Sequence, residues 1–173
     1  MPKLQQQQAV LLIILVAAAL RMLPHPENFT PIGALALFSG AYLQRHVLWL
    51  VPLAALLLGD VAHGLYNGVV MLAVYLGFIA STAIGRNLLR SRDSGGRICL
   101  GVGAGALAFW IISNLGNWLA FGPHSLEGLL QCYVRGLPYL ASSVVGDALY
   151  SLVLFGGYRL LCNSPLVEHR ATA

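Results

Sequence analysis

No Asp, Glu, Lys or Arg occurs between Arg97 and Glu127, and this charge-free stretch limits what the chain can be more than any other feature. A helix needs about 20 residues to cross a bilayer, so the stretch is long enough for one span. The rest of the sequence agrees, since 58% of the 173 residues are apolar and only 9% are charged. A soluble domain is usually about 25% charged. The sequence therefore predicts an integral membrane protein whose surroundings are the lipid bilayer.

Apolar runs between charged residues predict six transmembrane helices in a single all-α membrane domain over residues 1–173. The expected helices cover residues 9–23, 31–43, 47–66, 68–85, 98–120 and 137–161. With short loops, six spans of about 20 residues use the whole length, which leaves no room for an attached ATPase, kinase or DNA-binding domain.

The basic residues predict the orientation of the bundle. With the N-terminus inside, the cytoplasmic segments hold eight of the ten basic residues, namely Lys3, Arg45, Arg86, Arg90, Arg92, Arg97, Arg159 and Arg170. Only Arg21 and Arg135 are then outside. Because cytoplasmic loops of membrane proteins are enriched in Lys and Arg, both termini are expected in the cytoplasm, as in a multi-pass protein of the bacterial inner membrane. The basic residues are spread over several loops, so no nucleic-acid partner is expected.

Polar side chains gather toward the expected outer side, as in a binding site that opens outward. The first outer loop contributes Arg21, His25, Glu27, Asn28 and Thr30, and the third helix contributes Asp60 and His63, followed by Asn67. The end of the fifth helix contributes Asn114, Asn117 and Trp118, and the last outer loop contributes His124, Glu127 and Arg135. Asp60 and His63 are three residues apart and share a helix face. An ionisable group such as Asp60 is costly inside a membrane, which predicts a pair with an arginine, a place in a functional site, or both, since such a pair can also line the site.

A second polar stripe lies in the last expected helix. Tyr139, Ser143, Asp147 and Tyr150 follow one another at helical spacing, which predicts that they face the interior of the bundle. The three cysteines show no C-x-x-C spacing, and no motif of a nucleophilic or metal-dependent enzyme occurs. No motif therefore indicates a bound cofactor, a metal site or a catalytic site, and we do not expect an enzyme. A metal site assembled from His25, His63 and His124 across the loops stays an alternative that no motif supports.

Two segments resemble a family of small bacterial membrane proteins of unassigned function. They are residues 21–43, which contain the loop PHPENFTP, and residues 110–158. The layout is similar to that of the S components of energy-coupling-factor vitamin transporters. That resemblance implies a six-helix bundle with both termini inside and an outward-facing site closed by the first, third and fifth loops.

Within that group, the nearest analogy is to the solitary cobalamin-uptake S components. The resemblance implies that their site residues correspond to His25, Asp60, Tyr75 and Arg135. The sequence departs from them in residues 66–75, which lack the cysteine that binds cobalt in some of these proteins. It also lacks, in the first expected helix, the Ala-x-x-x-Ala pair with which S components dock on a transmembrane partner.

We therefore expect a membrane-embedded binding or uptake protein for a vitamin-like small molecule, with a cobamide as the candidate ligand. In this hypothesis polar groups of the ligand meet Arg21, His25, Asn28 and Arg135, flat apolar surface comes from Tyr75 and Trp118, and Asp60 orients an arginine. No nucleotide-binding motif occurs, so energy would come from a coupling partner such as an ATPase or from a gradient.

Two alternatives remain open at this point. One is a structural or assembly subunit that binds no small ligand and fills its polar cluster with its own ion pairs. The other is an intramembrane enzyme that uses His25 or His63 as the acid–base group with Asp60 behind it, for which the histidine and the carboxylate must lie within hydrogen-bond reach.

Overall fold

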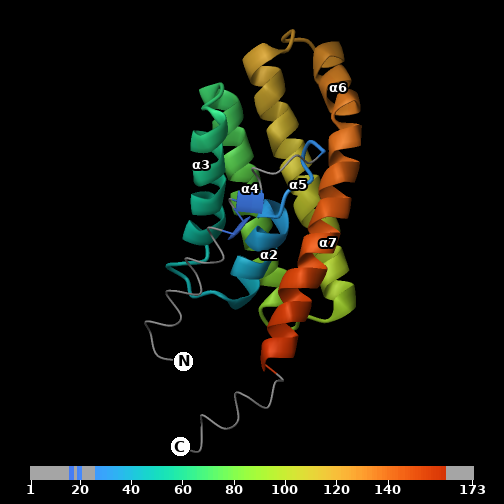
Figure 1. Ribbon diagram of the computed structural model, residues 1–173. Helices are drawn as coiled ribbons and strands as arrows, with labels where there is room; N and C mark the ends of the chain where they lie inside the picture. Colours follow the sequence, from blue (N-terminus) through green and yellow to red (C-terminus); the bar gives the residue numbers. More distant parts are fainter. Residues whose placement is uncertain (1–15, 18, 21–25, 163–173) are drawn as a thin grey trace, which may run out of the picture.

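The computed structural model describes residues 16–17, 19–20 and 26–162, and this part of the chain contains helices and no strand. The helices are α2 (Ile32–Tyr42), α3 (Leu50–His63), α4 (Gly68–Leu89), α5 (Gly95–Phe121), α6 (Leu126–Arg135) and α7 (Leu137–Cys162). They form an elongated bundle in which α4 and α5 run side by side (Figure 1). The prediction of an all-α protein is confirmed.

Three helical segments are long and apolar enough to cross a membrane: α4, α5, and the run Leu126–Leu160 that joins α6 to α7. α2 and α3 are apolar but have only 11 and 14 residues. The membrane character predicted from composition is therefore supported, whereas six full spans are not demonstrated. The first expected helix, over residues 9–23, lies largely outside the described residues, and of its residues 16, 17, 19 and 20 are helical.

The short helix α2 occupies the centre of the bundle. Every residue from Ile32 to Ala41 is buried, and α2 contacts α3, α4, α5 and α7. At 1.5 Å per residue it is roughly 16 Å long, about half the thickness of a bilayer core. Non-helical backbone at such a depth is tolerated where protein surrounds it. The N-terminus of α2 can therefore lie inside the molecule.

The expected boundaries differ from the observed helices where the backbone turns. The apolar run 47–66 contains α3, which ends at His63 because Gly64 follows with a φ of 97°, a conformation that suits glycine. Asn67 then caps α4, and its side-chain oxygen accepts hydrogen bonds from the Val69 and Val70 amides at 2.9 and 3.3 Å. α4 continues to Leu89 rather than to residue 85.

Helix α6 is an element that hydropathy does not predict. It begins after Ser125, whose hydroxyl accepts a hydrogen bond from the Gly128 amide at 3.1 Å. It ends at Arg135, and Gly136 separates it from α7. Leu126, Leu130 and Val134 form an exposed stripe along it, as a helix against lipid would show.

Asp93 lies in the connection between α4 and α5 and links this connection to α2 and α7. Its carboxylate accepts a hydrogen bond from the Tyr42 hydroxyl of α2 and lies 3.2 Å from the Arg159 guanidinium of α7. The Tyr42 hydrogen bond, assisted by Arg159, holds the pKa of Asp93 below its ordinary value of 3.8. Figure 1 places this connection at the end opposite to the α5–α6 connection.

Candidate functional site

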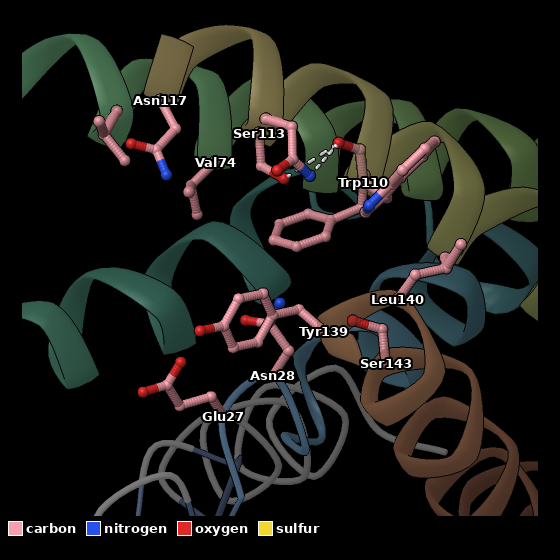
Figure 2. A pocket seen from close by; sticks show the side chains of 12 residues that line it. Glu27, Asn28, Val74, Trp110, Ser113, Asn117, Tyr139, Leu140 and Ser143 are labelled. Atoms are coloured by element: carbon pink, nitrogen blue, oxygen red, sulfur yellow. Dashed lines mark hydrogen bonds between the residues drawn. The ribbon is translucent and has the colours of Figure 1, made fainter. Parts of the chain in front are cut away.

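A pocket of about 260 Å³, here called the main pocket, lies among the residues before α2 and helices α4, α5 and α7. Its lining comprises Glu27, Asn28, Val70, Val74, Phe109, Trp110, Ser113, Asn114, Asn117, Tyr139, Leu140 and Ser143. Figure 2 shows polar side chains converging on it from segments far apart in the sequence. A polar pocket within an otherwise apolar bundle is the feature expected of a ligand site.

Asn28 reaches the main pocket because of a local turn. The Phe29 amide donates a hydrogen bond to the Pro26 carbonyl at 3.0 Å, and Asn28 has a φ of 61°. Asparagine tolerates this left-handed conformation better than most residues. The ring of Phe29 packs against Tyr150 of α7, with ring centroids 5.9 Å apart, which fixes the turn against the bundle.

The donors and acceptors of the main pocket are mainly carboxamides. Asn114 donates a hydrogen bond to the Trp110 carbonyl at 2.8 Å, whereas the side chains of Asn28 and Asn117 have no hydrogen-bond partner within the described part of the chain. The Trp110 indole nitrogen is also buried without a partner among these residues. A carboxamide offers both a donor and an acceptor. The pocket can therefore satisfy a neutral polar ligand.

One carboxylate contributes to the main pocket. The Glu27 carboxylate lies near the hydroxyl of Tyr139 (Figure 2). That hydroxyl donates a hydrogen bond to the carboxylate. Among the lining residues no Lys, Arg or His occurs. The described wall of the main pocket is therefore neutral to acidic.

A second cavity of about 260 Å³, the rim pocket, adjoins the first between the end of α5 and α6. The two share Asn114, Asn117 and Tyr139. The rim pocket adds Trp118, whose indole N–H donates to the Pro123 carbonyl at 2.9 Å, and Arg135. It thus combines an aromatic wall with a cation.

A third and smaller space, the inner cavity, shares Asn28, Phe109 and Ser143 with the main pocket. Its volume is about 20 Å³, and its lining comprises Asn28, Thr30, Gly33, Phe78, Ser81, Phe109, Ser143 and Asp147. Ser143 and Asp147 are only 6% and 7% exposed. The predicted inward orientation of the stripe in the last helix is confirmed for Ser143 and Asp147.

The predicted site residues fall into three groups. Asn28, Asn114, Trp118 and Arg135 line the main pocket or the rim pocket. Asp60 and Tyr75 lie together elsewhere, at the contact of α3 with α4, where the Tyr75 hydroxyl donates a hydrogen bond to Asp60 at 3.1 Å. Asp60 is fully buried there and lines none of the three cavities.

The histidines do not join a described site. His63 is exposed at the end of α3, and its Nδ1 donates to the Gly59 carbonyl at 2.9 Å, so the shared face with Asp60 does not bring the two side chains into a hydrogen bond. Arg21 and His25 lie outside the described residues. Among the residues that are described, no group of three or more His, Cys, Asp or Glu gathers as metal ligands would.

Several residues of the main pocket were not predicted as site residues. Glu27 and Asn117 belong to the predicted outer polar cluster but not to the predicted ligand contacts, and Ser113 belongs to neither. Tyr139 and Ser143 were recognised only as part of an inward stripe. Ser113 lies four residues before Asn117, so the two share a face of α5, and this spacing is the signal that could have found Ser113.

Comparisons with characterised proteins and with solved structures return no match for this chain. A comparison with protein families returns one, a family of unknown function designated DUF6580, whose model matches residues 2–169. That match covers nearly the whole sequence, including every segment that forms the main pocket. The chain is therefore a member of this family of unknown function, DUF6580.

Proposed function

We propose that this protein is a membrane-embedded binding and uptake protein for a vitamin-like small molecule. The observation that carries the proposal is the main pocket, in which the amides of Asn28 and Asn117, without a partner among the described residues, meet aromatic walls at one end of an apolar bundle. A structural subunit without a ligand would be expected to satisfy such groups by hydrogen bonds of its own.

The orientation of the bundle supports uptake from outside the cell. The connection between α4 and α5 carries Arg90 and Arg92, and Arg97 follows in the first turn of α5. By the positive-inside rule this end faces the cytoplasm. The rim pocket, at the far end of α5, then opens to the outside, as a receptor in the bacterial inner membrane requires.

The size of the site limits the ligand. Sites for small molecules usually measure about 300–1,000 Å³. At about 260 Å³ the main pocket lies just below this range, so alone it suits only a small ligand. A cobamide is larger than the main pocket and the rim pocket together, so it would fill both and extend beyond their mouths. Its peripheral amides would then match the asparagines, and Arg135 would meet a phosphate or carbonyl oxygen. Transport would draw its energy from a coupling partner or from a gradient.

The test is calorimetric titration of the detergent-purified protein with cobalamin and with cobinamide. We expect dissociation constants of about 1 μM or below, and an increase of about tenfold for Asn117→Ala, the loss of one hydrogen bond of about 1.4 kcal/mol. Asn117 makes no hydrogen bond within the described chain, so its removal should leave the fold intact. His25→Ala tests whether the first outer loop contacts the ligand, and we expect it to raise the dissociation constant as well.

Asn87→Ala is the matched control, because Asn87 is exposed on α4 and lines none of the three cavities. Equal weakening by Asn87→Ala and Asn117→Ala would contradict the assignment of the main pocket. Absence of heat with either corrinoid would exclude cobamides as the ligand class.

A further inference from the structure

Asp147 is an ionisable group in the middle of α7, and the binding role proposed above does not use it. It lies ten residues into a helix of 26 residues and is 7% exposed. A carboxylate at such a depth must either be compensated by positive charge or carry a proton. The groups around Asp147 therefore determine whether it is a paired carboxylate or carries a proton.

The contact that the carboxylate makes is with the start of α2. It accepts a hydrogen bond from the Ala34 amide and lies against Gly33, where a Cβ atom would overlap it. The N-cap residue of α2, Pro31, provides no side-chain cap, so Asp147 performs this role from another helix. The positive end of a helix dipole amounts to about half a charge, which compensates a carboxylate only in part.

No charged side chain completes the compensation among the described residues. On α4 the neighbours in the inner cavity are Phe78 and Ser81, and on α5 the neighbour is Phe109. The other titratable groups nearby are Tyr150, one turn along α7, and the pair Glu27 and Tyr139 in the main pocket. None of these is a cation.

The inner cavity has room for one water molecule beside Asp147. A water needs about 10–15 Å³ of such space and two to four polar partners, and the cavity offers about 20 Å³. The hydroxyls of Thr30 and Ser143 line it together with the carboxyl group. Ser143 is 6% exposed and makes no hydrogen bond in the described part of the chain, so its hydroxyl is free for this water.

The same serine connects the inner cavity to the main pocket. Asn28, Phe109 and Ser143 line both spaces, and Figure 2 shows Ser143 in the wall of the main pocket near Tyr139. A proton can therefore pass from water in the main pocket through the Ser143 hydroxyl and one water to the carboxyl group, with no basic side chain on the way.

We propose that Asp147 is a proton-binding site coupled through Ser143 to the main pocket, so that ligand binding and proton binding influence each other. The coupling rests on the proposed function, because it assumes that the main pocket holds a ligand. A ligand that fills the main pocket displaces the water next to Ser143, which lines both spaces, and so changes the cost of a charge on Asp147. By linkage, the proton then changes the affinity for the ligand by the same factor.

The proton site is tested first without any ligand, by infrared difference spectra of the full-length protein in lipid nanodiscs. We expect the wild-type protein to show the C=O band of a protonated carboxyl group, which Asp147→Asn lacks and which declines about tenfold per pH unit above its midpoint. Asn keeps an oxygen that accepts the Ala34 hydrogen bond, so this variant should fold. Absence of a band specific to Asp147 at every pH where the protein is folded would overturn the proposal.

The route is tested by the rate at which this band shifts in deuterated water. Ser143→Ala is expected to slow the exchange, and the neighbouring Ser142→Ala, whose side chain lines none of the three cavities, is not. Equal exchange rates in the two variants would overturn the role of Ser143.

The coupling is tested by titrating cobinamide in two buffers of different ionisation enthalpy. Proton uptake with the wild type and none with Asp147→Asn is the expected result. Binding without proton exchange would overturn the coupling and leave the proposed function intact. A carboxyl band without any cobinamide binding would support the proton site and contradict the proposed ligand.

Discussion

At the scale of single residues, the hydrogen bond from Tyr75 to Asp60 links α3 to α4. Asp60 is buried, so losing this donor leaves a carboxyl group less satisfied in an apolar setting. We expect Tyr75→Phe to lower the free energy of unfolding by about 1–3 kcal/mol. Thermal unfolding in detergent measures the effect.

Tyr133→Phe is the matched control for that prediction. The Tyr133 hydroxyl donates to the Ile111 carbonyl at 2.9 Å, a neutral and exposed contact. Such a bond contributes only about 0.5–1.5 kcal/mol. A loss in Tyr133→Phe as large as in Tyr75→Phe would show that burial of Asp60 does not determine the cost.

A second residue-scale prediction concerns Asp93, which joins the ends of α2 and α7. Its folded pKa lies below the ordinary value of 3.8, because Tyr42 and Arg159 stabilise the charged form. Its contribution to stability is therefore present above pH 3.8 and is lost as the pH falls through the folded pKa. The melting temperature of wild type should exceed that of Asp93→Asn at pH 7, and the difference should vanish in acid.

High salt provides a further check on Asp93. The side chains of Asp93 and Arg159 are 36% and 44% exposed, so solvent screens the pair and its contribution to stability should be small. Added salt should reduce the difference in melting temperature between wild type and Asp93→Asn. A difference between wild type and Asp93→Asn that grows as the pH falls would contradict the assignment.

At the scale of elements, the packing of α2 on α4 depends on two glycines. A Cβ atom at Gly40 would overlap the Thr82 carbonyl, and one at Gly85 would overlap the backbone of Leu37. Backbone cannot move aside as a flexible side chain can. We expect Gly85→Ala to destabilise the protein by about 1–3 kcal/mol, as overpacking does, in denaturation of the detergent-solubilised protein.

Gly103→Ala makes the same exchange in α5, where an added Cβ would meet nothing within 4 Å. It should be neutral or stabilise by about 0.5–1 kcal/mol, because alanine favours a helix. If both variants lost stability equally, the close approach of α2 and α4 would not be the cause.

The elements also show which part of the fold the sequence could predict. Long apolar runs predicted α4, α5 and α7, since nothing but a helix satisfies the backbone of such a run in lipid. Hydropathy overlooked α6 because Glu127, Gln131 and Arg135 make the segment polar. Its signals were the cap at Ser125 and the spacing of Leu126, Leu130 and Val134, which a search for helical periodicity would have found.

At the scale of the whole molecule, the candidate site depends on how helices rotate against one another. Polarity and expected depth were sufficient to predict Asn28, Asn114, Trp118 and Arg135 as residues of one region. They did not predict that Asp60 and Tyr75 would bind each other instead, because that pairing requires one particular rotation of α3 against α4. Rotation is set by packing over the whole interface, which no single stretch of sequence records.

Orientation in the membrane is the last property of the whole molecule, and two loop residues test it. Ser94 and His124 are exposed at opposite ends of α5, so Ser94→Cys and His124→Cys are a matched pair. In a background with Ser in place of the three native cysteines, a membrane-impermeant maleimide should label His124→Cys in intact cells. Ser94→Cys should react only after permeabilisation, because its arginine-rich loop is expected in the cytoplasm. The opposite pattern would place the rim pocket on the cytoplasmic side, and the uptake proposal would then fail even if the pocket binds a ligand.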